Sequence, residues 1–219
     1  LHQRRGDDGA ASEVLRRALR QHGHSNDLVL ALARSLQHEG KHDDAVHVVR
    51  QALLGHPDSR RLRFGLAGVL ERAGRWRAAI KTVRAITAKH PKYAPGHNFI
   101  GYTLLEQGKR LDEAERLIRR ALYLQPGEGY IIDSLGWLYH RRGDHARARR
   151  LLWMAHRLSP REPEILFHLA EAEAASNRLT RAIQLLERAL PISEDARLTR
   201  RIKRRLNQLM KRRVGSAGP

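Results

Sequence analysis

Cysteine is absent from the 219 residues, so the chain forms neither disulfide bonds nor thiolate sites. Long apolar runs are absent too, because no stretch approaches the roughly 20 residues that span a bilayer. The chain opens with LHQRRGDDG, which has neither the apolar core of a signal peptide nor a cysteine for lipid attachment. These absences exclude a disulfide scaffold and a membrane-spanning helix within this sequence.

Acidic residues are scarce relative to basic ones. The chain has 42 Lys and Arg against 23 Asp and Glu, a formal net charge of +19, and 35 of the basic residues are arginine. Such a charge allows an anionic partner, whether nucleic acid, lipid head groups or an acidic protein. Arginine is also a good helix former, so arginines that simply cover the solvent faces of helices explain the same excess. Both interpretations stay open.

Signatures of catalysis are missing. The 13 histidines are scattered, and the closest pairs, His22 with His24 and His42 with His47, lack the helical i, i+4 spacing of a zinc site. Exposed positions on helix surfaces explain the histidines better. No phosphate-binding glycine loop and no nucleophile elbow occurs in the sequence. We therefore expect no enzyme, no catalytic residue, no metal site, no cofactor and no small-molecule substrate.

A clear pattern is present between Gly129 and Pro160. Apolar residues recur there at i, i+3, i+4 and i+7, first over residues 131–141 and again over residues 145–158. This periodicity predicts two short helices that pack against each other in antiparallel orientation.

Small and turn-forming residues occupy defined places in this segment. Gly136 and Ala148 stand where the two helices approach each other closely, because a larger side chain there would separate them. Gly143 suits the tight turn between the helices, and Pro160 ends the second one.

The same spacing recurs along the whole chain. The small residue of each first helix recurs 34, 34, 35 and 34 residues apart, at Ala33, Ala67, Gly101, Gly136 and Ala170. The small residue of each second helix recurs at Ala45, Ala79, Ala114, Ala148 and Ala182. The pattern resembles the tetratricopeptide repeat, a helix–turn–helix unit of 34 residues. The resemblance implies an all-α protein, a right-handed α-solenoid of stacked helix pairs.

The repeat register predicts how the chain is divided. We expect the second helix of a truncated repeat at residues 1–24, repeats at 26–59, 60–92, 93–127 and 129–160, an atypical repeat at 161–193, a basic capping helix at 194–213, and a disordered tail at 214–219. The capping helix is expected to start at Ser193, followed by two acids. The half repeat leaves an apolar face uncovered, so we expect further repeats or a partner protein before Leu1.

In arrays of this kind the first helices line a concave groove. The residues that the register places in this groove are Arg34, Phe64, Asn98, Tyr102, Tyr130, Asp133, Trp137, His140, Phe167 and Glu171. Aromatic residues make up only 5% of the chain, yet five of them fall in this set. Aromatic anchors with polar groups between them suit an extended peptide or a partner helix, and we expect Trp137→Ala to weaken such binding without loss of helicity. Alternatively, some of these rings complete the packing between repeats.

The basic residues of the C-terminal helix carry a second hypothesis. One apolar stripe predicts that this helix covers the last repeat. The remaining face, together with the arginines that the second helices carry on the convex side, offers a site for nucleic acid or another anionic surface. In the C-terminal helix this site is formed by Arg200, Arg201, Lys203, Arg204, Arg205, Lys211, Arg212 and Arg213.

Residues 93–190 show a closer resemblance. Runs such as IGYTLLEQGKRLDEAERLIRRALYLQP and YIIDSLGWLYHRRGDHARARRLLWMAHRLSP are similar to bacterial cell-envelope repeat proteins. Several of these are outer-membrane lipoproteins, and one group consists of adaptors for periplasmic proteases. The resemblance implies a bacterial scaffold or adaptor that works within a larger complex of proteins. It suggests the periplasm or the outer membrane as its location, with the cytoplasm left open.

Overall fold

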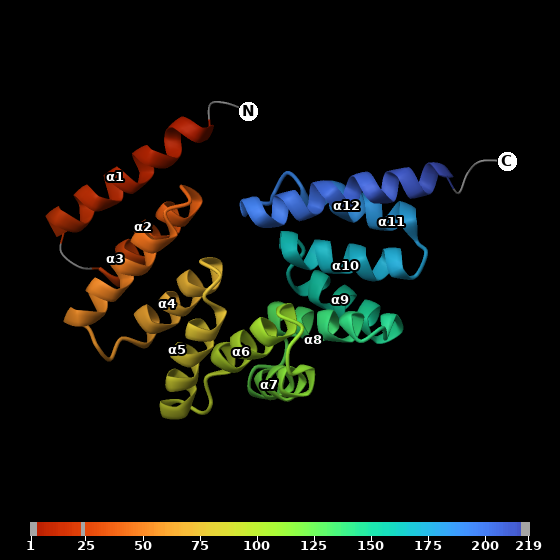
Figure 1. Cartoon of the computed structure of the whole chain (residues 1–219). Helices are drawn as coiled ribbons and strands as arrows, with labels where there is room; N and C mark the ends of the chain where they lie inside the picture. The colour runs from red at the N-terminus through yellow and green to blue at the C-terminus, as the bar shows by residue number, and fades with distance from the viewer. Residues whose placement is uncertain (1–3, 23–24, 216–219) are drawn as a thin grey trace. The chain divides into compact units, whose positions relative to one another are not determined.

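The computed structural model describes residues 4–22 and 25–215, which form 12 helices and contain no strand (Figure 1). The helices are α1 (Arg4–His22), α2 (Asn26–His38), α3 (His42–Gly55), α4 (Arg60–Arg72), α5 (Trp76–Lys89), α6 (Ala94–Glu106), α7 (Leu111–Leu124), α8 (Gly129–Arg141), α9 (His145–Leu158), α10 (Pro163–Ala175), α11 (Leu179–Ala189) and α12 (Ala196–Gly215). Within the described residues, no helix is both long and apolar enough to cross a membrane.

The chain divides into two compact units, residues 1–103 and 104–219. In the first unit α1 packs on α2, α2 on α3, α3 on α4 and α4 on α5, and α2 also contacts α4. Leu36, Val49, Leu70 and Val83 are buried along these contacts, one from each of α2 to α5. Their helical spacing gives each helix one apolar face, and burial of that face stabilises the stack.

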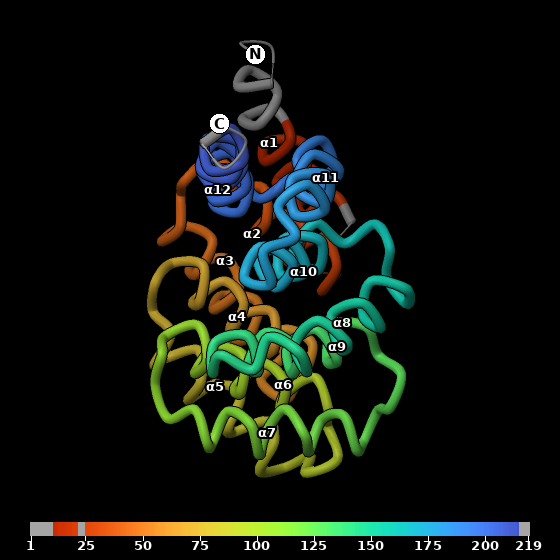
Figure 2. Tube along the Cα trace, turned by 90° about the vertical axis from the view of Figure 1, so that its right-hand side faces the viewer, coloured from red at the N-terminus to blue at the C-terminus, as the bar shows by residue number. Residues whose placement is uncertain are grey.

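The second unit continues the same scheme. Here α8 packs on α9, α9 on α10, α10 on α11 and α11 on α12, and Figure 2 shows α10, α11 and α12 following one another. Gly136 of α8 lies so close to α9 that an added Cβ would stand 2.8 Å from Cγ of Leu152. The close approach that the repeat pattern predicted at this glycine is therefore present.

Turns within the helix pairs use residues with positive φ. Gly40, Gly74 and Gly143 have φ of 79°, 77° and 82°, values that glycine adopts without steric strain. Asn177 takes the same place in the last pair with φ 60°, and Arg110 has φ 50° in the turn that is one residue longer.

The C-terminal helix differs from its predicted bounds at both ends. The side chain of Asp195 accepts hydrogen bonds from the backbone N–H groups of Arg197 (2.8 Å) and Leu198 (2.9 Å), so Asp195 caps the helix and Ser193 does not. The helix then continues through Val214 to Gly215, because no residue before this glycine interrupts it. The first two residues of the expected disordered tail are therefore helical, and residues 216–219 lie outside the described residues.

Candidate functional site

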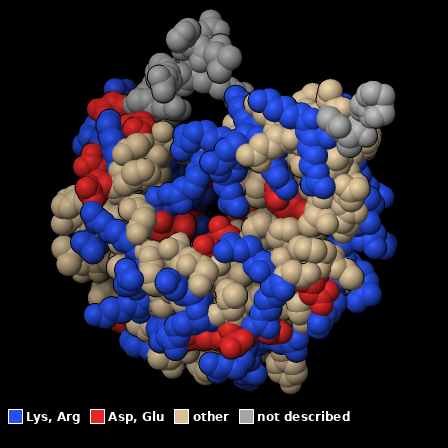
Figure 3. All heavy atoms as spheres, turned by 45° about the vertical axis from the view of Figure 1, so that its right-hand side comes forward, with Lys and Arg blue, Asp and Glu red and all other residues tan. Residues whose placement is uncertain are grey.

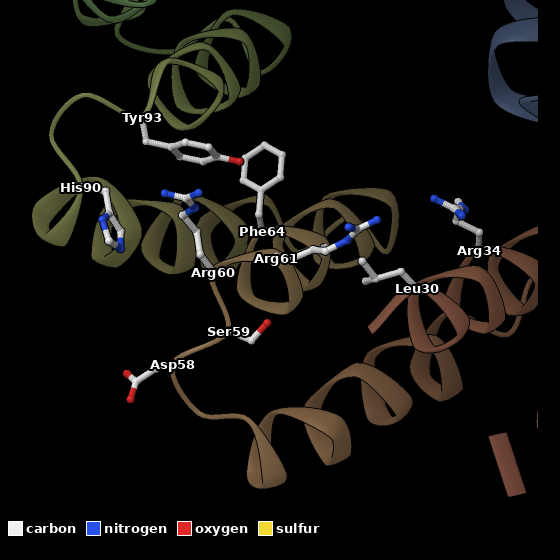
Figure 4. A pocket seen from close by; sticks show the side chains of 10 residues that line it. Leu30, Arg34, Asp58, Ser59, Arg60, Arg61, Phe64, His90 and Tyr93 are labelled. Atoms are coloured by element: carbon white, nitrogen blue, oxygen red, sulfur yellow. The ribbon is translucent and has the colours of Figure 1, made fainter. Parts of the chain in front are cut away.

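A cavity of about 790 Å³ opens in the first unit, bordered by α2, α4 and the turn before α6 (Figure 4). Its lining includes Leu30, Arg34, Arg60, Arg61, Phe64 and Tyr93. Arg34 and Phe64 belong to the groove set that the repeat register predicted, whereas the other four do not. The cavity thus combines an apolar floor with a cationic rim.

Close helix packing and aromatic contacts build the floor. Gly65 of α4 faces Leu30 of α2, and a Cβ at this glycine would meet Cδ2 of Leu30 at 2.2 Å. The ring of Phe64 packs edge-on against Tyr93 at 5.5 Å and against Phe99 at 5.6 Å between ring centroids. Burial raises the pKa of the Tyr93 hydroxyl above its ordinary value. The floor of the cavity is therefore apolar, and its residues on α4 contact α2 on one side and the rings of Tyr93 and Phe99 on the other.

The cations lie at the start of α4. The hydroxyl of Ser59 accepts a hydrogen bond from the backbone N–H of Leu62 (3.2 Å), which fixes the first turn of the helix. Arg60 and Arg61 occupy that turn. The guanidinium of Arg60 lies 4.9 Å from the centroid of the Tyr93 ring, and Arg61 pairs with Asp27 of α2. In Figure 4 the side chains of Arg60 and Phe64 lie beside Tyr93.

The groove residues at the end of the first unit are mostly enclosed. Asn98 is buried, and its Oδ1 has no hydrogen-bond partner among the described residues. Tyr102 is partly exposed. Tyr102 is therefore the one of these two side chains that reaches the surface.

In the second unit, most of the predicted groove side chains are covered. Asp133, Trp137 and Phe167 each keep only 5% of their surface exposed. Tyr130 is exposed at 42%, and His140 is partly buried. The structure therefore leaves Tyr130 as the accessible aromatic side chain of the groove set on α8.

The ring of Trp137 lies between two histidines. It stacks on His168 with centroids 4.2 Å apart and on His140 with centroids 4.8 Å apart. Its Nε1 donates a hydrogen bond of 2.7 Å to a carboxylate oxygen of Glu106. With both faces and the polar edge engaged, Trp137 joins α6, α8 and α10 within this unit.

Two histidines are buried, although the sequence predicted that the histidines lie exposed on helix surfaces. His168 is fully buried, and its Nδ1 lies 2.9 Å from Oδ2 and 3.0 Å from Oδ1 of Asp133. Burial alone would lower the pKa of His168, but the Asp133 carboxylate outweighs burial and raises it. His156 is buried as well. The expectation of exposed histidines was wrong for these two. For His168 the reason is that apolar periodicity does not reveal a polar partner 35 residues away.

The C-terminal helix α12 covers part of the second unit's groove residues on α10. Arg201 of α12 lies 4.7 Å from the centroid of the Phe167 ring and 3.6 Å from a carboxylate oxygen of Glu106. Arg205 donates a 2.7 Å hydrogen bond to Glu171. Two basic residues that the sequence assigned to anion binding thus bind carboxylates of their own unit.

The other basic residues of α12 remain at the surface. Arg212 donates a hydrogen bond of 3.1 Å to the side chain of Asn177. The exposed members of the predicted anion-binding set are Arg200, Lys203, Arg204, Lys211, Arg212 and Arg213. Figure 3 shows that Lys and Arg side chains spread over most of the visible face and are not confined to one patch.

Replacement of His140 by glutamine should flatten the acid side of the pH–stability curve. Burial first, and then the positive charges on His145, His168, Arg141 and Arg205, lower the pKa of His140 to about 4. The stability that comes from the neutral ring is fully present above the unfolded pKa of about 6.5 and is lost as the pH falls toward the folded value. Urea denaturation at about pH 8 and about pH 5 should therefore show a smaller acid loss in H140Q than in the unmodified chain. Equal losses would contradict this assignment.

Sequence models of one family match most of the chain. One model described as tetratricopeptide repeat covers residues 30–94 and 69–129, and a second with the same description covers residues 139–206. The chain belongs to the tetratricopeptide repeat family. This identification agrees with the helix pairs and with the small residues at their contacts.

A bacterial relative shares part of this tetratricopeptide sequence. The TPR repeat-containing protein PA4667 of Pseudomonas aeruginosa is 40% identical over 81 residues, which are 37% of this chain and 14% of the relative. The chain thus matches only a small part of that relative's length. Solved structures are similar over a longer stretch.

Three solved structures illustrate the extent of this similarity. The thermophilic TPR protein TTC0263 of Thermus thermophilus has a TM-score of 0.69 at 23% identity and covers 82% of this chain and 97% of its own. Pseudomonas aeruginosa pilF has a TM-score of 0.60 at 21% identity over 88% and 87% of the two chains. Cut9 with Hcn1, from an APC/C hetero-tetramer, has a TM-score of 0.72 at 16% identity over 88% and 38%. At these identities the similarity confirms the predicted all-α repeat fold and nothing more.

Sequence reasoning on this tetratricopeptide chain missed two of the three arginines that line the cavity. Arg60 and Arg61 follow directly on Ser59, at the first turn of α4, where acids are normally favoured. Two arginines in a first turn that contains no acid are a signal that the sequence already carries. The groove register did not include them because in α2 and α4 it selected only Arg34 and Phe64.

Proposed function

We propose that this chain is a non-enzymatic scaffold or adaptor that binds a segment of a partner protein along its first helices. The observation that carries the proposal is the open cavity between α2 and α4, where aromatic side chains lie below exposed cations. Large aromatic side chains with nearby polar groups are typical of binding hot spots. Tetratricopeptide repeats generally mediate protein–protein interaction, which agrees with this assignment.

The relatives favour a bacterial protein that works in a complex. The 40% identical relative comes from Pseudomonas aeruginosa, and one structural neighbour, Cut9, occurs in a hetero-tetramer with Hcn1. We extend this to a role in a bacterial assembly, with the cell envelope as the proposed site, because residues 93–190 resemble envelope repeat proteins.

Site-specific photocrosslinking in the native cell tests the proposed surface. Benzoylphenylalanine at Arg34 of α2 or at Tyr130 of α8 should crosslink to the partner, since both positions are exposed on first helices. The same residue at Arg50 of α3 or Arg150 of α9, both exposed on second helices, is the matched control and should not. Crosslinks formed only from the control positions would move the interaction to the second helices and refute the proposal.

A second candidate function rests on the solvent side of α12. Arg200, Lys203, Arg204 and Lys211 recur there at i, i+3, i+4 and i+11, and all four are exposed. This spacing gives a basic stripe that suits the phosphates of nucleic acid. A gel shift with RNA and DNA at two salt concentrations distinguishes the candidates, because phosphate contacts make binding strongly salt-dependent. The absence of a shift at low salt would dismiss this candidate.

A further inference from the structure

We infer that the cavity between α2 and α4 selects an acidic, extended peptide segment that carries one large apolar side chain. The inference rests on the proposed function and adds to it the place and the chemistry of the partner. The occupant is a segment of a partner protein in which carboxylates flank an aromatic or large aliphatic residue.

Charge is the first step of the argument. Within the described part of the chain, no carboxylate forms an ion pair with Arg34 or Arg60. The acid in the lining, Asp58, lies 3.7 Å from Arg63 and 3.7 Å from Lys89, so other cations already share its charge. The rim therefore carries positive charge that the protein itself does not neutralise.

The start of α4 adds to this excess. Acids in the first turn stabilise a helix because the N-terminal end of its dipole is positive, and α2 carries Asp27 in its first turn while α3 carries Asp43 and Asp44. The first turn of α4 contains no acid and carries Arg60 and Arg61 instead. A carboxylate supplied by a partner would be attracted by the dipole and by a guanidinium at the same place.

The floor of the cavity determines the uncharged part of the ligand. Leu30, Phe64 and Tyr93 offer apolar and aromatic surface below the arginines. The volume of about 790 Å³ lies within the usual range of ligand pockets, which suits one large side chain and a short stretch of backbone. An extended segment can place one side chain on the floor and its neighbouring carboxylates at the rim, so we assign an extended occupant.

The second unit does not offer the same chemistry. Its first-helix acids Glu106 and Glu171 are engaged by Arg201 and Arg205, and the ring of Phe167 is covered by Arg201. The charges of these two acids and the ring of Phe167 are thus matched within the unit. In the first unit, by contrast, the arginines of the rim and the apolar floor of the cavity are left for a ligand to contact.

Fluorescence anisotropy with the full chain tests the inference. The probe is a short labelled peptide, capped at both ends, in which glutamates flank one phenylalanine. We expect saturable binding that Arg34→Ala and Arg60→Ala each weaken about tenfold, which is the loss of one charge-assisted contact. Arg50→Ala removes the same charge from an exposed site on α3 and should leave the affinity unchanged.

A chain of this net charge attracts any acidic peptide, so the probe needs its own controls. Replacement of the phenylalanine by alanine should weaken binding on the order of tenfold, because the apolar floor loses its contact. Replacement of the glutamates by lysines should abolish it. Arg34 is exposed, so R34A keeps the fold, and circular dichroism of each variant verifies this.

Two results would overturn the inference. Equal binding to the unmodified chain and to the R34A/R60A double variant would place the peptide elsewhere, and indifference to the phenylalanine would leave only general charge attraction. If photocrosslinking from Arg34 nevertheless captures a partner, the scaffold function stands and only the acidic chemistry fails. If the peptide binds as expected but no first-helix crosslink forms in the cell, the cavity stands and the cellular function fails.

Discussion

Trp137→Ala should lower the free energy of unfolding by about 4 kcal/mol, the size typical of a buried tryptophan truncated to alanine. The substitution leaves a cavity between His140 and His168, whose rings now stack on both faces of the indole. It also removes the hydrogen bond that Nε1 donates to Glu106. Urea denaturation of the full chain, followed by far-ultraviolet circular dichroism, measures the loss. Since domains are stable by only about 5–15 kcal/mol, a large part of the stability should disappear.

A matched control shows that burial, and not the loss of any aromatic ring, is responsible. Tyr123 of α7 is 78% exposed, so Tyr123→Ala should change stability by less than about 1 kcal/mol. Trp137→Phe keeps a ring between the histidines and loses the hydrogen bond, and its effect should fall between the other two. A Trp137→Ala protein of native stability that fails to bind its partner would instead restore Trp137 as a groove anchor.

The fold followed from local pattern because its determinants repeat at short range. Gly136 packs on Leu152 of the next helix, and Gly143 forms the turn between them, so one repeat of sequence contains both partners. The spacing of apolar residues decides which face each helix buries. No information from distant parts of the chain was needed for these features.

The exposure of the groove residues was less predictable, because in the second unit the residues that cover them come from far along the chain. The register placed Arg34 and Phe64 on the groove side of the first helices, and both side chains line the cavity of the first unit. It gave no sign that Arg201 of α12 lies over Phe167, since a periodic pattern shows which face a residue occupies and not what covers that face. The partners of buried polar groups are equally hidden, as the pairing of Asp133 shows.

Asp133→Ala should also cost about 3–5 kcal/mol, because removal of one partner leaves the other charge buried without compensation. Asp133 is 5% exposed and its partner His168 is fully buried, so water cannot take the place of the carboxylate. Denaturation of the unmodified chain and of the variant under the same conditions gives the difference. A loss of less than about 1 kcal/mol would mean that the pair contributes no more than a surface ion pair does.

The pH dependence of Asp133→Asn distinguishes charge from shape, since asparagine keeps the size and the hydrogen-bonding oxygen. The carboxylate raises the pKa of His168 above its usual value. The stability from this pairing is therefore fully present below the unfolded pKa of about 6.5 and is lost as the pH rises through the folded pKa. We expect the variant to lose more stability, relative to the unmodified chain, at about pH 6 than at about pH 9. The opposite trend from His140 is present in both proteins and cancels in this difference, so a loss that does not change with pH would show that His168 is neutral in the folded chain and that Asp133 acts only as a hydrogen-bond acceptor.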